Sequence, residues 1–253
     1  KGTWRLREGG AQGPKRLPAF RPYAAVLSRA KQLVLGENEV LRRLEAVRAL
    51  LHHDSEQHIH RVETPGYRAS AHSGLVPDVS VLVTLYDYEH LVAETLDSIL
   101  ASCGVSTEIV IVEDHATDNS RAVAERYLHE HPDAAIVLLA KDANEGLAKA
   151  RNTGINECRA DLVMMMDADN LVYPTCLERL RAALVYDSAA AFAYAALERF
   201  GAEAGLVSAY AWNPEWLCAA NYIDAQAMIR RSVLVEFGGY RTDDPLVFGW
   251  EDW

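Results

Sequence analysis

The stretch LVMMMDAD at residues 162–169 is the part of this sequence that best indicates its fold. Five apolar residues in a row are followed by two aspartates, Asp167 and Asp169, with one alanine between them. A run that is apolar at every position is typical of a strand with both faces buried. Because alternate residues of an extended segment point the same way, we expect both carboxylates to lie on one side at the strand end.

Three further apolar runs precede this stretch, and a helical pattern follows each of the four. We expect strands at residues 79–85, 108–112, 134–140 and 162–166, and helices at about 91–100, 118–131, 146–158 and 174–186. Strict alternation of buried strands with helices predicts a parallel sheet with helices on both faces. The expected fold class is therefore α/β. Beyond residue 187 the pattern is weaker, and we expect only two strands, at 189–197 and 225–229.

Charge is unevenly distributed along the 253 residues. The net charge is −11, from 25 basic and 36 acidic residues, which argues against a nucleic-acid partner. Residues 1–76 carry an excess of six positive charges, and residues 77–253 an excess of 17 negative ones. No apolar run approaches the roughly 20 residues of a membrane-spanning helix, and the start of the chain does not resemble a secretory signal.

Four cysteines without a CxxC pair predict free thiols in a reducing compartment, so we expect a cytoplasmic protein.

The composition suggests four segments. We expect a basic flexible arm at 1–22, a helical segment at 23–60, a linker at 61–76 and the α/β domain at 77–253. Within that domain we expect a nucleotide-binding half at 77–187 and an acceptor half at 188–253, with the domain continuing past Trp253. The helical segment must bury its apolar stripe against the domain or against a second copy of the chain, which would form an oligomer. The arm suits either solvent or peripheral contact with the cytoplasmic face of an anionic membrane.

The two aspartates are candidate metal ligands. Ligands of open α/β sheets bind beyond the carboxyl ends of the strands, and several acidic residues follow the strands there. Two carboxylates on one side suit Mn²⁺ or Mg²⁺, with the remaining coordination positions left for water and phosphate oxygens. The glycine-rich fingerprints of dehydrogenases and P-loop NTPases are absent, as is the GxSxG motif of α/β-hydrolases.

Five blocks of sequence resemble the family 2 glycosyltransferases, which have the GT-A fold. The blocks are VSVLVTLYD at 79–87, IVIVEDHATDNS at 109–120, NEG through ARN at 144–152, MDAD at 166–169, and GGY followed by GWEDW at 238–253. The resemblance implies a metal-assisted enzyme that transfers a sugar from a nucleotide-diphosphate donor, with UDP the expected nucleotide. It also implies inversion at the sugar carbon and a sugar or glycoconjugate acceptor.

The resemblance also assigns roles to individual residues. It places Thr84 and Tyr86 in the base pocket and Asp114 on the base or ribose. It places Asn144, Gly146 and Arg151 beside the base and diphosphate, Asp167 on the ribose and metal, and Asp169 on the metal. Asp252, next to Glu251, would be the general base that deprotonates the acceptor hydroxyl.

Acceptor contacts are expected from Trp212, Asn221, Asp224 and Trp250. Trp212, together with Trp216 and Tyr222, suits either a platform on which a sugar stacks or a small core beneath a loop.

This sequence departs from the family pattern at three places. Asp87 stands where an asparagine is usual, His115 stands where a glycine is usual, and no histidine follows His131 to complete a metal shell. Two alternatives remain at this point. One is an inactive nucleotide-binding scaffold, and the other is a sugar-phosphate nucleotidyltransferase, which would need a basic, glycine-rich loop after the first strand.

Overall fold

The computed structural model describes residues 3–6, 67–71, 76–201, 204–219 and 221–242. The expected helices at 23–60, most of the arm, and residues 243–253 lie outside these ranges. The predictions of a membrane contact and of an oligomer through residues 23–60 therefore remain predictions. Within the described ranges, no helix combines the length and the apolar character needed to cross a bilayer.

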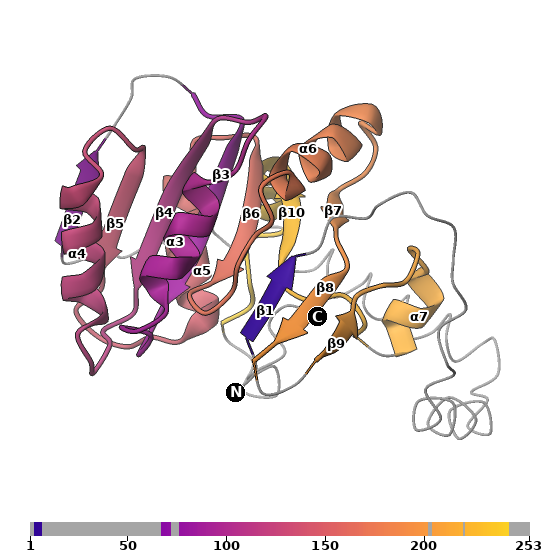
Figure 1. The fold of residues 1–253 in the computed structure, drawn as a ribbon. Helices are drawn as coiled ribbons and strands as arrows, with labels where there is room; N and C mark the ends of the chain where they lie inside the picture. The colour runs from indigo at the N-terminus through magenta and orange to yellow at the C-terminus, as the bar shows by residue number, and fades with distance from the viewer. Residues whose placement is uncertain (1–2, 7–66, 72–75, 202–203, 220, 243–253) are drawn as a thin grey trace. The chain divides into compact units, whose positions relative to one another are not determined.

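A seven-stranded sheet forms the centre of the fold, in the order β2-β5-β4-β3-β6-β10-β7 (Figure 1). Strands β5, β4, β3 and β6 run parallel to one another, and β2 and β10 run antiparallel to their neighbours. The bounds are β2 Tyr67–Ala71, β3 Val79–Leu85, β4 Thr107–Glu113, β5 Ile136–Ala140, β6 Leu162–Asp167, β7 Phe192–Tyr194 and β10 Ala227–Arg230. The predicted α/β class with a mostly parallel sheet is confirmed.

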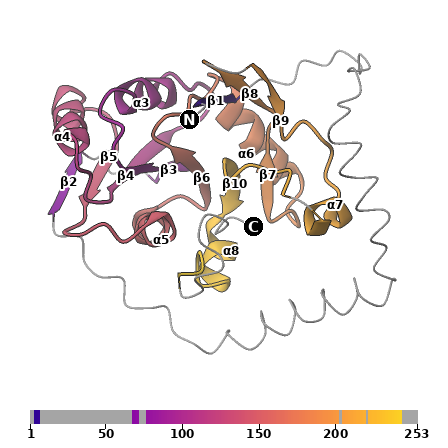
Figure 2. The ribbon, with the colours of Figure 1, turned by 90° about the horizontal axis from the view of Figure 1, so that it is seen from below.

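Helices cover both faces of this sheet, and Figure 2 shows α3, α4 and α6 on one side with α5 and α8 on the other. The bounds are α3 Val92–Leu100, α4 Ser120–Glu130, α5 Leu147–Glu157, α6 Cys176–Tyr186 and α8 Arg231–Glu236. Side-chain alternation explains the two layers: Met164 and Met166 pack with the first group of helices, and Met165 packs with the second. The methionine run is therefore strand core on both faces.

The packing of α5 on the sheet is close. A Cβ atom added at Gly154 would lie 2.0 Å from Leu82 Cδ1 in β3. Because Leu82 is fully buried, glycine is the residue that lets this helix approach the strand. The helix that carries Arg151 is thereby fixed against the middle of the sheet.

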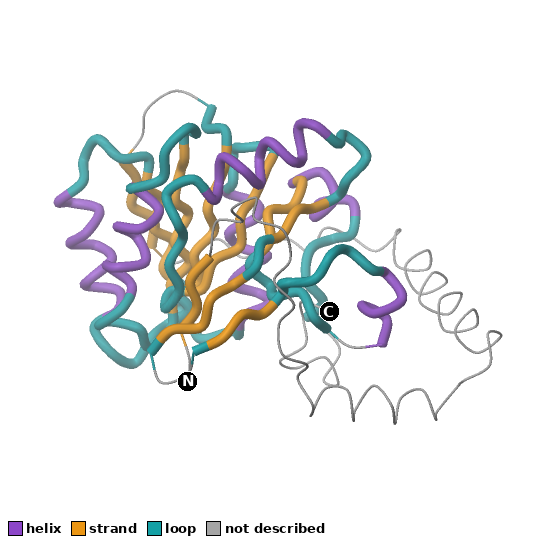
Figure 3. The backbone as a smooth tube through the Cα atoms, turned by 45° about the vertical axis from the view of Figure 1, so that its right-hand side comes forward, coloured by secondary structure: helices purple, strands orange, loops and turns teal. Residues whose placement is uncertain are grey.

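A second, three-stranded antiparallel sheet has the order β1-β8-β9, with bounds β1 Thr3–Leu6, β8 Leu197–Phe200 and β9 Gly205–Val207. Residues 189–197, predicted as one strand, are divided between β7 and β8, because the chain leaves the large sheet after Tyr194 and Leu197 pairs with β1 and β9. Between β9 and β10 the chain is mostly loop, with one short helix, α7, at Pro214–Ala219 (Figure 3).

Two strands lie where the sequence predicted none. β2 falls within the expected linker at 61–76, and β1 falls within the expected flexible arm at 1–22. Both form by pairing with a strand distant in the sequence, β2 with β5 and β1 with β8. Such edge strands have little local signal, because the partner supplies the hydrogen bonds.

Candidate functional site

A cavity of about 460 Å³ opens at the carboxyl ends of β3, β4 and β6. Eleven residues line it: Thr84, Leu85, Tyr86, Tyr88, Asp114, Asn144, Gly146, Leu147, Ala150, Asp167 and Asp169. Of the residues predicted to contact the nucleotide or the metal, all but Arg151 are on this lining. Sites for small ligands commonly have volumes in this range.

Asp167 and Asp169 border the cavity from the end of β6, and the alanine between them is fully buried. Two hydrogen bonds from α3 hold the loop that follows: the Thr95 hydroxyl donates to the Ala168 carbonyl at 2.8 Å, and the Ser98 hydroxyl accepts from the Val172 amide at 3.1 Å. Burial of the alanine fixes the segment between the two carboxylates. Both carboxylates line the same cavity, although β6 ends at Asp167 and Asp169 lies in the turn that follows instead of in the expected extended segment.

Arg151 contacts this pair from α5. Its guanidinium lies 3.4 Å from Asp167 Oδ1 and 5.1 Å from the centre of the Tyr240 ring. The backbone of Tyr240 is held in turn by Asn152, which accepts its N–H at 2.7 Å and donates to its carbonyl at 2.8 Å. Arg151 thus offsets part of the negative charge at Asp167 and links the site to the segment after α8.

The charge and chemistry of this lining fit a hard divalent cation. Asp167 and Asp169 supply two carboxylates, and the cavity leaves room for water and phosphate oxygens as further ligands. Among the described residues, no group of three or more His, Cys, Asp or Glu side chains could hold a metal by itself. The two described carboxylates therefore suit an ion that takes further ligands from water or from an anionic molecule.

Tyr88 is a cavity residue that the sequence analysis missed. Its hydroxyl hydrogen-bonds Asp169, and burial together with the charges of Asp169 and Asp167 raises the pKa of Tyr88 to about 12. The phenol is therefore a neutral donor at physiological pH, which orients the Asp169 carboxylate. No periodic signal identified Tyr88, because it lies in the loop after β3.

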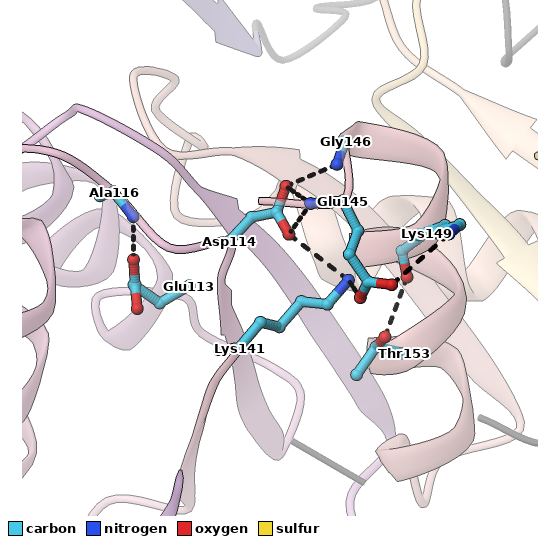
Figure 4. A network of polar contacts seen from close by, with 8 residues as sticks. All are labelled: Glu113, Asp114, Ala116, Lys141, Glu145, Gly146, Lys149 and Thr153. Carbon is cyan, nitrogen blue, oxygen red and sulfur yellow. Dashed lines mark hydrogen bonds and ion pairs between the residues drawn. The ribbon is translucent and has the colours of Figure 1, made fainter. Parts of the chain in front are cut away.

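Asp114, which also lines the cavity, is anchored by several polar contacts (Figure 4). Its carboxylate accepts the Gly146 amide at 2.8 Å and the Glu145 amide at 3.1 Å, and its Oδ1 lies 3.4 Å from Lys141 Nζ. A carboxylate has about four acceptor positions, so these contacts leave capacity for a ligand. Asp114 thereby fixes the start of α5, where Asn144 and Gly146 line the cavity.

Lys141 is a second residue that the sequence analysis missed. Its side chain is only 6% exposed, and it forms ion pairs with both Asp114 and Glu145. Glu145 also pairs with Lys149 at 3.5 Å. The hydrogen bond from Lys141, more than any other contact, holds the pKa of Glu145 below its usual value. One buried lysine therefore ties the end of β5 to the loop that begins α5 (Figure 4).

The two substituted turn positions keep a left-handed backbone. Asp87 and His115 both have φ of 57°. Asp87 stabilises its turn by accepting the Thr117 amide at 2.7 Å, and the Glu113 carboxylate accepts the amide of Ala116. Burial is the main reason that the pKa of Glu113 is raised. Histidine and aspartate are among the residues that tolerate this conformation, which explains how the turns after β3 and β4 each accommodate a departure from the family pattern.

The residues predicted to bind the acceptor lie away from the cavity lining. Trp212 is 52% exposed. Asn221 and Asp224 use side-chain oxygens to accept nearby backbone amides, those of Ile223 at 3.3 Å and Gln226 at 3.0 Å. Trp250 and the predicted base Asp252, with its neighbour Glu251, lie outside the described residues.

Comparison with known proteins gives a consistent family match. The model of the family described as "Glycosyl transferase family 2" matches residues 80–241, more than half of the chain. The succinoglycan biosynthesis protein ExoO of Rhizobium meliloti is 34% identical over 105 residues, 42% of this chain and 29% of that protein. The uncharacterized glycosyltransferase EpsJ of Bacillus subtilis is 36% identical over 106 residues, 42% of this chain and 30% of that protein. The matched region thus spans less than a third of either relative.

Solved structures share the fold. A mannosyltransferase of Pyrobaculum calidifontis, in complex with GDP-Man and Mn²⁺, aligns with a TM-score of 0.52 at 20% identity, over 81% of this chain and 57% of that one. Residues 1–349 of TarS from S. aureus, in complex with UDP, align with a TM-score of 0.51 at 18% identity, over 69% of this chain and 52% of that one. At these identities the likeness supports the fold alone.

Proposed function

Because this chain belongs to glycosyl transferase family 2, we propose that it transfers a sugar from a nucleotide-diphosphate donor to an acceptor hydroxyl, with inversion and with the help of Mn²⁺ or Mg²⁺. The observation that carries the proposal is that Asp167 and Asp169 share a cavity with Thr84, Tyr86 and Asp114. The mannosyltransferase neighbour holds GDP-Man and Mn²⁺, and the TarS neighbour holds UDP. We expect UDP as the nucleotide, with GDP as the alternative to test.

The described side chains divide the work of binding the donor. Thr84, Tyr86 and Asp114 would contact the base and ribose, and Asn144 and Gly146 would border the base and diphosphate. Asp167 and Asp169 would hold the metal, with Tyr88 orienting Asp169. A bound divalent ion supplies a Lewis acid that stabilises negative charge on a departing diphosphate.

The transfer itself is a single displacement. The acceptor oxygen forms a bond to the anomeric carbon while the bond from that carbon to the phosphate oxygen breaks, and its electron pair leaves with the nucleoside diphosphate. The acceptor proton passes to a carboxylate, for which we propose Asp252. Attack from the side opposite the leaving group inverts the anomeric centre. A general base of this kind must lie within about 3 Å of the hydroxyl it deprotonates.

Two features of the described residues support a need for the metal. The cavity lining carries three carboxylates and no lysine or arginine. The guanidinium of Arg151 lies 3.4 Å from Asp167 Oδ1 and is directed to that carboxylate. A diphosphate would meet net repulsion in such a cavity unless a cation bound with it.

We also propose a cytoplasmic site of action.

The proposal is tested by measuring the nucleoside diphosphate released from a panel of UDP- and GDP-sugars in Mn²⁺. We expect release from one class of donor, and about 10²–10³-fold less from Asp169→Asn. Asp133→Asn is the matched control, because it removes an exposed carboxylate from the loop before β5, at the amino ends of the parallel strands and opposite the cavity. Asp252→Asn should bind nucleotide and fail in transfer.

Nucleotide binding without release or transfer from any donor would instead support an inactive scaffold. Release that persists in Asp169→Asn would contradict the proposed role of this carboxylate.

A further inference from the structure

Six aromatic side chains gather in the part of the chain after β6. They are Phe192, Tyr194, Tyr210, Trp212, Trp216 and Tyr222, here called the aromatic shelf. Most of their ring contacts are edge-to-face: Phe192 meets Trp212 at 5.4 Å and 84°, and Tyr210 meets Trp216 at 5.7 Å and 74°. Tyr222 contacts Tyr194, Tyr210 and Trp216 in the same manner. The rings therefore form one connected surface.

Exposure distinguishes this shelf from a small core. Tyr210 is 54% exposed, Trp212 52% and Trp216 46%. The large apolar side chains of the two cores beside the central sheet are almost fully buried. Large aromatic residues that gather on a surface commonly mark a place where something binds. The packing of the domain does not explain why three of these rings remain open.

Hydrogen bonds hold the shelf in one arrangement. The Tyr222 hydroxyl accepts the Asn213 amide at 2.7 Å and donates to the Asn213 carbonyl at 3.2 Å. The Tyr194 hydroxyl donates to the Tyr210 carbonyl at 2.8 Å, and Asn213 Oδ1 accepts the Trp216 amide at 3.0 Å. Rings fixed before binding lose little entropy when a ligand stacks on them.

Strand register places the β7 part of the shelf, Phe192 and Tyr194, near the cavity. Met228 of β10 pairs with Met164 of β6 on one side and with Ala193 of β7 on the other. Tyr194 in β7 is therefore level with Met165 in β6, and β10 lies between the two strands. Met165 precedes Asp167 by two residues. With strands about 4.8 Å apart and residues about 3.3 Å apart, roughly 12 Å separates the backbones of Tyr194 and Asp167.

The two sets of side chains also share a face of the sheet. Met164 and Met228 belong to the core beneath α3 and α6, and Ala193 packs against that core. Alternation then directs Phe192, Tyr194 and Asp167 to the opposite face, where Arg151 of α5 meets Asp167. The shelf thus continues the face on which the donor would bind.

The charges around the shelf restrict the chemistry of its ligand. Residues 201–229, which carry four of the six rings, contain no lysine or arginine and include the acidic residues Glu203, Glu215 and Asp224. Arg230, which lies beside β7, directs its guanidinium to the carbonyls of Leu184, Asp187 and Ala190. An anionic ligand would gain no attraction there. A neutral sugar ring has an apolar face of C–H groups and a rim of hydroxyls, which suits an open aromatic ring with hydrogen-bonding groups at its edge.

We propose that the aromatic shelf binds a ring of a neutral saccharide acceptor, with Trp212 and Trp216 as the stacking residues. This inference rests on the proposed function, because it identifies the acceptor of the same reaction. A protein partner, or another segment of this chain, lying on the shelf would exclude a saccharide and is the competing outcome.

The first test is intrinsic tryptophan fluorescence of the full chain, titrated with neutral tetrasaccharides of glucose, mannose and N-acetylglucosamine, and with tetragalacturonate as an anionic counterpart. We expect at least one neutral tetrasaccharide to bind and tetragalacturonate not to bind. Trp212→Ala and Trp216→Ala should each weaken binding about three- to tenfold. Tyr186→Ala, which removes a 94% exposed ring at the end of α6, should leave binding unchanged.

The second test does not depend on variants that fold. Exposed tryptophans of the wild-type chain are oxidised with N-bromosuccinimide, alone and in the presence of each tetrasaccharide of the panel. The oxidised residues are identified by mass spectrometry. The proposal predicts that Trp212 and Trp216 are oxidised in the free chain and protected by a neutral saccharide. Lack of protection by every neutral member of the panel overturns the proposal, as does protection by the anionic one alone.

Failure of this inference can be told apart from failure of the proposed function. If donor release in Mn²⁺ is intact and no saccharide protects the shelf, the shelf proposal fails and the donor site stands. If a neutral saccharide protects the shelf while no nucleotide sugar is turned over, the shelf proposal stands as a saccharide site and the transfer reaction fails.

Discussion

Residues 79–186 and residues 188–242 are built in different ways. The first region has four parallel strands of five to seven residues, with almost every position buried, and each is followed by a helix. The second has strands of three or four residues, two six-residue helices and several open aromatic rings. In the first region, the buried core on both faces of the sheet holds the carboxylates at the carboxyl ends of the parallel strands. The irregular region presents a surface held mainly by ring contacts and local hydrogen bonds.

This difference bears on how the two proposed ligands, the nucleotide-sugar donor and the saccharide acceptor, are recognised. A site at strand ends can be rigid, because the core on both faces of the sheet fixes it. A surface of short strands and loops can change its side chains without disturbing that core. The shared chemistry of a family is therefore expected in the first region, and the choice of acceptor in the second.

The largest contrast should come from one substitution in each region. Asp169→Asn is expected to lower donor-dependent transfer about 10²–10³-fold, because the variant loses charge needed to hold the metal. Trp212→Ala should leave donor hydrolysis near the wild-type rate and lower only transfer to a saccharide. Both are measured by released nucleoside diphosphate, with and without acceptor. Equal loss of donor hydrolysis in the two variants would contradict the proposal that the first region binds the donor and the second the acceptor.

The next effect concerns the buried lysine of the first region. Lys141→Met leaves the carboxylate of Asp114, which is 6% exposed, without its ion pair, and should cost about 3 kcal/mol of unfolding free energy. Lys149→Met is the matched control, because Lys149 pairs with the same Glu145 while 49% exposed, and should change stability by about 0.5 kcal/mol or less. Urea unfolding measures both. Similar losses in the two variants would contradict a special role for the buried pair.

The same pair predicts a pH dependence. The pKa of Glu145 is lowered in the folded state, so its stabilising contribution is fully present above the unfolded value of about 4.5 and is lost as the pH falls through the folded value below it. Lys141→Met should remove most of that loss, because the hydrogen bond from Lys141 is the main cause of the shift. Urea unfolding of the wild type and of Lys141→Met between pH 6 and 3 gives the slope of the unfolding free energy against pH for each protein. Identical slopes would contradict the assigned role of Lys141 in lowering the pKa of Glu145.

A smaller effect is expected at the start of α5. Gly146 has φ of 89° and no atom within 4 Å of the position of an added Cβ, so Gly146→Ala adds backbone strain without a clash. The cost should be about 1–3 kcal/mol, accompanied by weaker nucleotide binding. Gly205→Ala in β9 is the control, because it also has open space and lacks the positive φ. Thermal unfolding that is unchanged in Gly146→Ala would show that the turn is not strained.

The smallest effect is expected from Tyr88→Phe. Removing the hydrogen bond to Asp169 should cost about 1 kcal/mol, or about fivefold in the affinity for nucleotide with Mn²⁺. Tyr186→Phe, on the exposed end of α6, should have no effect. Isothermal titration of both variants provides the measurement. A loss in Tyr186→Phe as large as that in Tyr88→Phe would argue against an orienting role.

The sequence predicted the first region well for a physical reason. Its strands are buried on both faces, so each is apolar throughout, and the residues that follow them must meet at one edge. The apolar run and the two aspartates after it therefore predict that Asp167 and Asp169 lie at the strand end, and the structure has both on the cavity lining. Tyr88 and Lys141 were not found, because a lone polar residue near a strand end has no period, and its role depends on partners brought close by the fold.

The second region was less predictable because its elements are short. Three-residue strands such as β7 give too few alternating positions to show a pattern, and the break after Tyr194 depends on which strands pair. β1 and β2 were missed for the same reason, since their partners are far away in the sequence. The aromatic rings could be identified one by one, and only the fold shows that they form one surface.

In the proposed function, Asp167 and Asp169 bind a nucleotide diphosphate through a divalent cation. Isothermal titration of UDP and GDP into the full chain, with and without Mn²⁺, tests it most directly. We expect that one nucleotide binds at least about tenfold more tightly with Mn²⁺, that this gain disappears in Asp169→Asn, and that Trp212→Ala retains it. Equal affinity with and without Mn²⁺, or no binding of either nucleotide, would contradict it.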